Sequence, residues 1–120
     1  MILLKDFLER NASPSETVLM YPEMGAVHFI VDRPYVGRFA SATLAWLSED
    51  WYREWLAQLQ TRKPRFAVVL KQMPEYFQFC YFTVASNQQK FIETTKFIRD
   101  QYMPVDETPS WIIYRLKGTP

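Results

Sequence analysis

Five apolar residues follow one another in the segment Arg65-Phe66-Ala67-Val68-Val69-Leu70, which stands between Lys63-Pro64 and Lys71-Gln72. A strand with one face in water would alternate apolar and polar residues, so an unbroken run between a proline and polar residues predicts a strand buried on both faces. In a chain of 120 residues, helices must supply the cover on both faces. The sequence therefore predicts an α/β three-layer sandwich, with helices on both faces of a mixed, mostly parallel sheet of about four strands and a C-terminal hairpin.

The length and composition of the chain favour one domain, 1–120. Its 120 residues leave no room for a second core. The formal net charge of +1 provides no field that would attract nucleic acid, so we expect no nucleic-acid partner. No apolar run approaches the ~18 to 20 residues that cross a bilayer, and the apolar segment at the N-terminus is too short for a signal peptide. We therefore expect the chain as given to be a soluble domain.

Two amphipathic helices are expected ahead of the central strand. In 2–11 the apolar residues recur at helical spacing, and the proline at position 14 cannot continue the helix. The second helix is expected to begin after Ser48, a good N-cap residue followed by two acids, and to run to about residue 61. Its inward face is expected to consist of Trp51, Trp55, Leu56 and Leu59. Such a tryptophan cluster could stack on sugar rings, but at helical spacing it is more typical of core.

The segment 17–21 is the second strand candidate. We place it beside 66–70 and parallel to it, because helical segments lie before and after it. Residues 23–31 are expected to form a helix that turns Val27, Ile30 and Val31 inward.

The C-terminal third is expected to contain one helix and a hairpin. An apolar stripe at helical spacing predicts a helix over 87–102, which Pro104 should end. The segments 102–106 and 111–116 are joined by a short turn, and this pattern predicts an antiparallel pair of strands. The residues of the helical stripe are Phe91, Thr95, Ile98 and Tyr102.

The loop at 32–39 holds the candidate binding residues. Arg33 and Arg38 are five residues apart with Tyr35 between them, and this combination would suit a phosphate or a carboxylate. The alternative is that both arginines pair with surface carboxylates or with backbone carbonyls. The sequence leaves both interpretations open.

Several classes of site are disfavoured. The three glycines are too scattered for a glycine-rich phosphate loop. One cysteine and one histidine exclude an internal disulfide and a metal site built on paired thiolates or histidines. Cys80 and His28 could form a nucleophile and base pair, but the aromatic neighbours of Cys80 should raise its pKa and leave it inert. We therefore expect no catalytic residue, no metal and no cofactor.

Taken in order, the landmarks of the chain resemble those of a known family. They are the helix end Phe7-Leu8-Glu9-Arg10-Asn11-Ala12-Ser13-Pro14, the strand Thr17-Val18-Leu19-Met20-Tyr21-Pro22, the segments Phe29-Ile30-Val31-Asp32-Arg33-Pro34 and Gly37-Arg38-Phe39, a tryptophan-rich helix, Lys63-Pro64-Arg65-Phe66-Ala67-Val68-Val69, Phe97-Ile98-Arg99-Asp100-Gln101-Tyr102 and Trp111-Ile112-Ile113-Tyr114-Arg115. This order, over nearly the whole chain, resembles the soluble C-terminal domain of bacterial membrane glycosyltransferases (GT-C type) that are similar to dolichyl-phosphate-mannose protein mannosyltransferases and aminoarabinose transferases.

The resemblance implies a function for the parent protein. Such an enzyme transfers a sugar from a polyprenyl-phosphate donor to a lipid or protein acceptor at the extracytoplasmic (periplasmic or extracellular) face of the cell membrane. This chain would then be an accessory domain attached to the transmembrane region, noncatalytic by itself, because the catalytic acid of such enzymes lies in the membrane region. Arg33, Tyr35 and Arg38 would contact the acceptor or the lipid phosphate. The family usually has a small residue where this chain has Asp32, and a pairing of Asp32 with either arginine would favour the structural interpretation.

Two other functions are considered beside this one. The chain could be a free-standing α/β binding module for a small anion or a saccharide, with a pocket near Arg33 and Arg38. It could also be a small cysteine-dependent enzyme, which would require an exposed Cys80.

Overall fold

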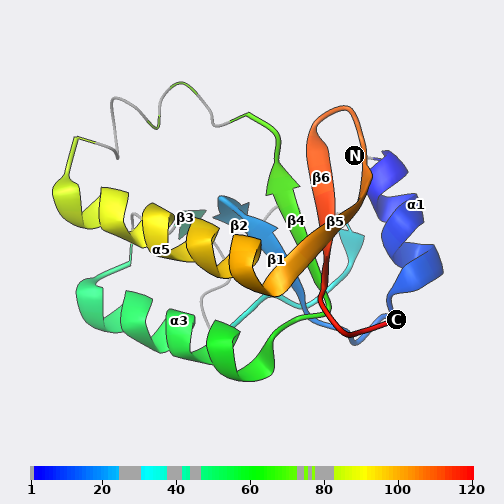
Figure 1. The fold of residues 1–120 in the computed structure, drawn as a ribbon, viewed down its shortest axis with the longest axis horizontal. Coiled ribbons are helices and arrows are strands. Elements are labelled where there is room, and N and C mark those ends of the chain that lie inside the picture. Colours follow the sequence, from blue (N-terminus) through cyan, green and yellow to red (C-terminus); the bar gives the residue numbers. More distant parts are fainter. Residues whose placement is uncertain are drawn as a thin grey trace.

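The computed structural model describes residues 2–24, 31–37, 42–43, 47–72, 75, 77 and 83–120. These residues form an α/β fold with three helices, a mixed sheet of four strands in the order β1-β4-β6-β5, and a separate pair of short strands (Figure 1). The elements are α1 (Ile2–Asn11), β1 (Val18–Tyr21), β2 (Glu23–Met24), β3 (Ala42–Thr43), α3 (Glu49–Arg62), β4 (Phe66–Leu70), α5 (Ala85–Gln101), β5 (Tyr102–Glu107) and β6 (Trp111–Leu116).

The central strand is buried on both faces, as its composition predicts. β4 lies between β1, to which it is parallel, and β6, to which it is antiparallel. Phe66 and Val68 belong to one apolar cluster, while Ala67 belongs to another cluster, against which Val69 packs. Because successive side chains of a strand point to opposite faces, these two clusters are the two sides of the sheet. Full burial of a side chain the size of valine contributes about 1.5–3 kcal/mol, so β4 anchors both sides of the core.

Helices lie on both faces, but unequally. The cluster that contains Ala67 joins buried residues of α3 and α5 to one face of the sheet, and the cluster that contains Phe66 and Val68 joins α1 to the other face (Figure 1). One helix of ten residues covers less of a sheet than a full helical layer does. The three-layer sandwich expected from the sequence is therefore not confirmed, whereas the α/β fold with a C-terminal hairpin is.

The expectation of a mostly parallel sheet is not confirmed. β1 and β4 are parallel, but β6 is antiparallel to both of its neighbours, β4 and β5. The reason lies in the C-terminal hairpin. α5 passes directly into β5, which occupies the edge, and the tight turn then returns β6 into the position beside β4.

The first two helices begin and end close to where the sequence places them. α3 starts after Ser48, whose hydroxyl accepts a hydrogen bond from the backbone N–H of Trp51 at 3.2 Å. It ends at Lys63, which adopts the left-handed conformation with φ 40° and donates its N–H to the carbonyl of Leu59. One expected core residue is misplaced: Trp51 is 49% exposed and Tyr52 is buried in its stead. The buried stripe of α3 therefore starts at Tyr52 and not at Trp51.

Two other expectations need correction. Residues 23–31 are not a continuous helix, because Glu23–Met24 is strand β2 and pairs with β3; residues 25–30 lie outside the described part. α5 spans Ala85–Gln101 rather than 87–102, and it is Tyr102 that begins β5. Pro104 lies inside β5 instead of just beyond a helix end. It is tolerated there because β5 is an edge strand, where an N–H is not needed on the open side.

Candidate functional site

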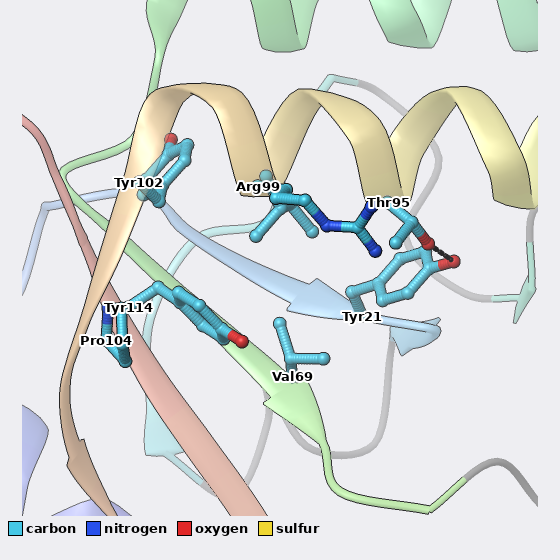
Figure 2. A pocket seen from close by; sticks show the side chains of 8 residues that line it. Tyr21, Val69, Thr95, Arg99, Tyr102, Pro104 and Tyr114 are labelled. Atoms are coloured by element: carbon cyan, nitrogen blue, oxygen red, sulfur yellow. Dashed lines mark hydrogen bonds between the residues drawn. The ribbon is translucent and has the colours of Figure 1, made fainter.

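A pocket lies between the C-terminal half of α5 and the sheet (Figure 2). Its volume is about 230 Å³. The strand pleat explains why the sheet contributes aromatic side chains here, since alternate residues of β5 and β6 face α5. We call this the Arg99 pocket, and it is lined by Tyr21, Val69, Thr95, Ile98, Arg99, Tyr102, Pro104 and Tyr114.

Arg99 is the charged group of the pocket. Its side chain runs from α5 across the pocket toward Tyr21 and Thr95, and the ring of Tyr114 reaches in from β6 (Figure 2). Within the described part of the chain, the Arg99 guanidinium forms neither a hydrogen bond nor an ion pair. The nearest acid in sequence, Asp100, is bound to Lys96 at 3.0 Å. A guanidinium without a carboxylate partner retains its five N–H donors for a ligand.

The hydroxyls of Tyr21 and Thr95 are bound to each other. Their oxygens are 2.8 Å apart, and the Tyr21 hydroxyl also reaches the carbonyl of Phe91 at 3.2 Å. Burial raises the pKa of Tyr21 to about 12, so the phenol is neutral over the physiological range. This pair fixes the side of the pocket next to β1.

The Tyr102 hydroxyl is also committed. It donates to the carbonyl of Pro64, just before β4, and burial raises its pKa. The ring of Tyr102 therefore faces the pocket while its polar end belongs to the fold. The hydroxyl of Tyr114, by contrast, has no hydrogen-bond partner among the described residues. Among the described lining residues, Arg99 and Tyr114 are thus the two side chains whose donors have no partner.

A shallower groove continues along α5 from the Arg99 pocket. It shares Tyr21, Thr95 and Arg99 with the pocket and extends to Ile92, which is 59% exposed. The groove carries a second cation, Lys96, but that ammonium is bound to Asp100. The unpaired charge is therefore at the junction of the groove and the pocket.

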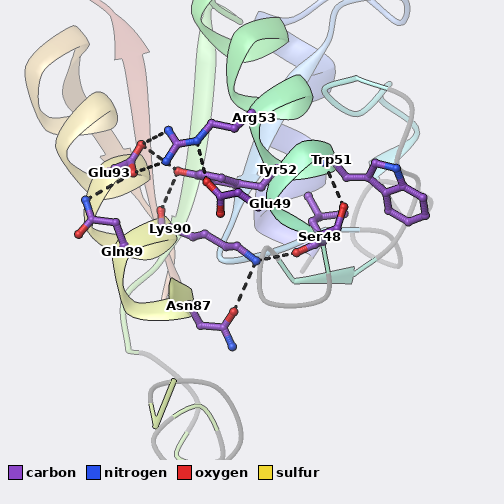
Figure 3. A network of polar contacts seen from close by, with 10 residues as sticks. Ser48, Glu49, Trp51, Tyr52, Arg53, Asn87, Gln89, Lys90 and Glu93 are labelled. Carbon is purple, nitrogen blue, oxygen red and sulfur yellow. Dashed lines mark hydrogen bonds and ion pairs between the residues drawn. The ribbon is translucent and has the colours of Figure 1, made fainter. Parts of the chain in front are cut away.

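A second polar cluster, between α3 and the N-terminal half of α5, has a different character (Figure 3). Arg53 forms two hydrogen bonds with Glu93, at 2.9 and 3.1 Å, and one with Glu49 at 2.9 Å. These bonds hold the pKa of Glu93 below its ordinary value. The Tyr52 hydroxyl donates to the carbonyl of Lys90 at 3.3 Å and to Glu93 at 3.4 Å. We call this network the α3–α5 clamp.

Lys90 is the buried cation of the α3–α5 clamp. It is 5% exposed, and its ammonium donates to the carbonyl of Leu47 at 2.6 Å and to the Asn87 amide oxygen at 3.5 Å (Figure 3). Burial lowers its pKa. A lysine with a lowered pKa is a candidate nucleophile or base. Here, however, its bond to the carbonyl just before the α3 N-cap gives it a structural role.

Arg33 lies in the fold rather than in either pocket region described above. It is 8% exposed, and its guanidinium donates to the carbonyls of Leu8 and Ala12 at 3.1 and 3.0 Å and to those of Val31 and Asp32 at 3.2 and 2.9 Å. The first two are carbonyls at the C-terminal end of α1; that of Leu8 also accepts the N–H of Ala12 at 2.8 Å. For Arg33 the alternative interpretation, bonding to backbone carbonyls, is the one that the contacts match.

The other two candidate residues of the loop are Tyr35 and Arg38. Tyr35 is half-buried and lines neither the Arg99 pocket nor its groove, and Arg38 lies outside the described residues. Ligand binding by these three residues therefore stays a prediction. Cys80 and His28 also lie outside the described residues.

Comparisons with known proteins do not add an identity. We found no family model, no curated protein and no solved structure that matches the chain. The described residues contain no group of three or more His, Cys, Asp or Glu side chains that could hold a metal ion. None of the helices in this described part has the length and apolar character of a membrane span. The chemistry of the Arg99 pocket is accordingly the strongest guide to function.

Sequence reasoning missed the Arg99 pocket, although one signal pointed to it. Thr95 belongs to the predicted core stripe of α5, and Arg99 follows it by one helical turn on the same face. The Arg99 side chain is exposed at the edge of this stripe. What no pattern shows is that Tyr21, Tyr102 and Tyr114 converge on it from three different strands.

Proposed function

We propose that the domain binds a small anion, a phosphate or a carboxylate, in the Arg99 pocket. The observation that carries the proposal is an arginine that has no partner among the described residues and lies in a concave site among aromatic rings. Guanidinium is the side-chain group best suited to such anions, because its planar N–H donors match two oxygens at once. Binding sites for small molecules are usually mostly apolar and contain a few polar groups.

Two other arginines of the chain, Arg53 and Arg65, differ from Arg99 in their partners. Arg53 is paired with Glu49 and Glu93, and Arg65 forms hydrogen bonds with Glu16 at 2.8 and 3.0 Å. These arginines have their charge balanced within the fold. Arg99 has not, so an anion can bind there without first breaking an existing ion pair.

The test is a titration of the protein with inorganic phosphate and with acetate, followed by NMR chemical shifts. We expect saturable shifts for residues around Arg99, and about a tenfold loss of affinity in Arg99→Gln, the usual scale for a lost charge-assisted hydrogen bond. Arg62→Gln is the matched control, because Arg62 is an exposed arginine on α3. Equal binding by both variants, or shifts spread evenly over all cations, would overturn the proposal.

A second proposal rests on the family resemblance of the sequence. The chain is then the extracytoplasmic accessory domain of a membrane glycosyltransferase, noncatalytic alone, and it assists binding of the acceptor or of the lipid phosphate. The order of the landmarks supports this proposal, and the three-layer sandwich expected from the sequence and the ligand contacts of Arg33, Tyr35 and Arg38 belong to it. The partners would be the transmembrane region, the polyprenyl-phosphate sugar and a lipid or protein acceptor.

The reading frame that encodes the chain tests this second proposal. We expect several apolar runs of about 18 or more residues upstream of Ile2. A frame that opens at Met1 would remove the proposal, whereas anion binding at Arg99 would be unaffected. In the same way, sugar transfer by the isolated chain would contradict the noncatalytic role.

A further inference from the structure

The walls of the Arg99 pocket contain rings as well as a charged group. Tyr102 and Pro104 are alternate residues of β5, so they face the same side of the sheet. Pro104 stands opposite Tyr114 in the pairing of β5 with β6. Three rings therefore line the pocket from adjacent strands of the sheet.

These rings are held in place before any ligand binds. The hydroxyl of Tyr102 is bound to the carbonyl of Pro64, which fixes the ring. The ring of Pro104 is rigid, and its strand neighbour Tyr114 is half-buried on β6. Preformed apolar walls of this kind bind a flat group at a low cost in conformational entropy.

The polar groups leave one position for the charge of a ligand. If the Tyr21 hydroxyl donates to the carbonyl of Phe91, the Thr95 hydroxyl must donate to Tyr21, and both protons are used. Arg99 and Tyr114 are then the donors that remain for an anion. Both line the pocket that the rings enclose, so the charge of the ligand and its flat part must lie close together.

The volume limits the size of the ligand. About 230 Å³ lies below the roughly 300–1,000 Å³ typical of pockets for drug-sized molecules. A single ring with one small substituent is thus a better match than an extended molecule.

We propose that the ligand of the Arg99 pocket is a small ring-bearing anion, in which a flat apolar ring packs against Tyr102, Pro104 and Tyr114 and a carboxylate or phosphate substituent binds Arg99. This inference rests on the proposed anion-binding function and adds the class of ligand to it. It distinguishes the pocket from a general anion site, which would not select for a ring.

Isothermal titration calorimetry with three probes tests the inference: phenyl phosphate, inorganic phosphate and phenol. We expect phenyl phosphate to bind at least about tenfold more tightly than either of the others, since burial of an aromatic ring against fixed rings contributes on that scale. Equal affinity for phenyl phosphate and inorganic phosphate would overturn the ring selectivity and leave anion binding intact. Failure of both phosphates to bind, or tighter binding of phenol, would overturn both proposals.

Two variants locate the effect. Tyr114→Phe keeps the ring and should keep the preference for phenyl phosphate, whereas Tyr114→Leu should reduce that preference by about tenfold. If Tyr114→Leu does not fold, Pro104→Ala removes a ring from an edge strand and should lower the same preference while inorganic phosphate binds as before. An unchanged preference in the ring-removing variants would place the ring elsewhere and contradict the inference.

Discussion

Two cations of α5, Lys90 and Arg99, have opposite surroundings. In the N-terminal half, the ammonium of Lys90 donates to the carbonyl of Leu47 and to the Asn87 amide oxygen (Figure 3). In the C-terminal half, Arg99 lies among tyrosines and a proline and has no such partner in the described part of the chain (Figure 2). The comparison indicates which charge maintains the fold and which remains for a ligand.

The difference follows from what each half faces. The α3–α5 clamp lies between two helices whose exposed edges carry acids that can pair across the gap. The Arg99 pocket faces the sheet, and its lining contains no carboxylate. A cation in such surroundings contributes little to folding, because it neither gains a partner nor loses its water.

Arg33 provides the sharpest form of the comparison, because its guanidinium donates to four backbone carbonyls. Arg33→Met should lower the free energy of unfolding by about 2–3 kcal/mol, since the buried carbonyl of Ala12 would lose its Arg33 donor and that of Leu8 would keep only the N–H of Ala12. Urea denaturation measures this change. The affinity for phosphate at Arg99 should be the same in the variant as in the parent protein. A loss below about 0.5 kcal/mol would mean that these carbonyls reach water, and the contrast between used and unused cations would weaken.

Lys90 and Arg99 can then be compared directly on the same helix. Lys90→Met should cost about 1–2 kcal/mol of stability, because the carbonyl of Leu47 loses a buried donor, and it should leave phosphate affinity unchanged. Arg99→Gln should do the reverse. Denaturation and phosphate titration of both variants measure the two effects, and a variant that changes both quantities equally would break the comparison.

The buried tyrosines predict how the stability of the fold changes at alkaline pH. Burial raises the pKa of Tyr21 to about 12 from an ordinary value of 10.0. The contribution of neutral Tyr21 to the free energy of unfolding is therefore complete below pH 10. It is lost as the pH rises toward 12, because Tyr21 ionises at lower pH in the unfolded chain than in the folded one. Tyr21→Phe should cost about 0.5–1.5 kcal/mol at neutral pH, through the lost hydrogen bonds, and should flatten the alkaline decline.

Tyr52 on α3 provides a second test of alkaline instability, since burial raises its pKa to about 12 as well. Denaturation from pH 8 to 12 of Tyr21→Phe and Tyr52→Phe would show whether each substitution removes part of the decline. If neither changes the slope, the tyrosines do not account for alkaline instability.

The smallest effect is expected from the exposed part of the α3–α5 clamp. Hydrogen bonds from Arg53 hold the pKa of Glu93 below its ordinary 4.5, so the contribution of Glu93 is present above that pH and is lost as the pH falls through its lowered pKa. Glu93→Gln should make stability less dependent on pH in the acid range, and added salt should reduce the difference from the parent protein. Thermal denaturation at pH 3 to 7 in low and high salt measures this, as pairs between exposed side chains contribute little. A difference that persists unchanged in high salt would argue against an ionic origin.

Much of the fold was predictable because its signals are local. The run Phe66–Leu70 specifies a strand with two buried faces, and the Ser48 cap sets the start of α3 within one residue. The antiparallel hairpin of β5 and β6 also follows from neighbouring residues. Errors arose where a local pattern leaves a choice: Trp51 is adjacent to the buried stripe, and Glu23–Met24 are in a strand formed with distant residues.

The site was less predictable than the fold. Two arginines around a tyrosine in a loop are a reasonable anion signal, yet the fold uses Arg33 to bind the end of α1. Whether an arginine binds a ligand depends on whether a carbonyl or a carboxylate of the protein reaches it first. That is a property of contacts between residues tens of positions apart, which spacing does not encode.

By itself, the sequence determined the helices, the doubly buried strand and the hairpin, because apolar periodicity acts over a few residues and dictates which face is removed from water. Only the tertiary structure decided that β6 enters the sheet between β4 and β5, that the cations of Arg33 and Lys90 are used by the fold, and that Arg99 is not. Strand order and charge pairing depend on which surfaces meet when separate elements pack. The free energy of a buried charge is set by those neighbours, and they come together only in the folded chain.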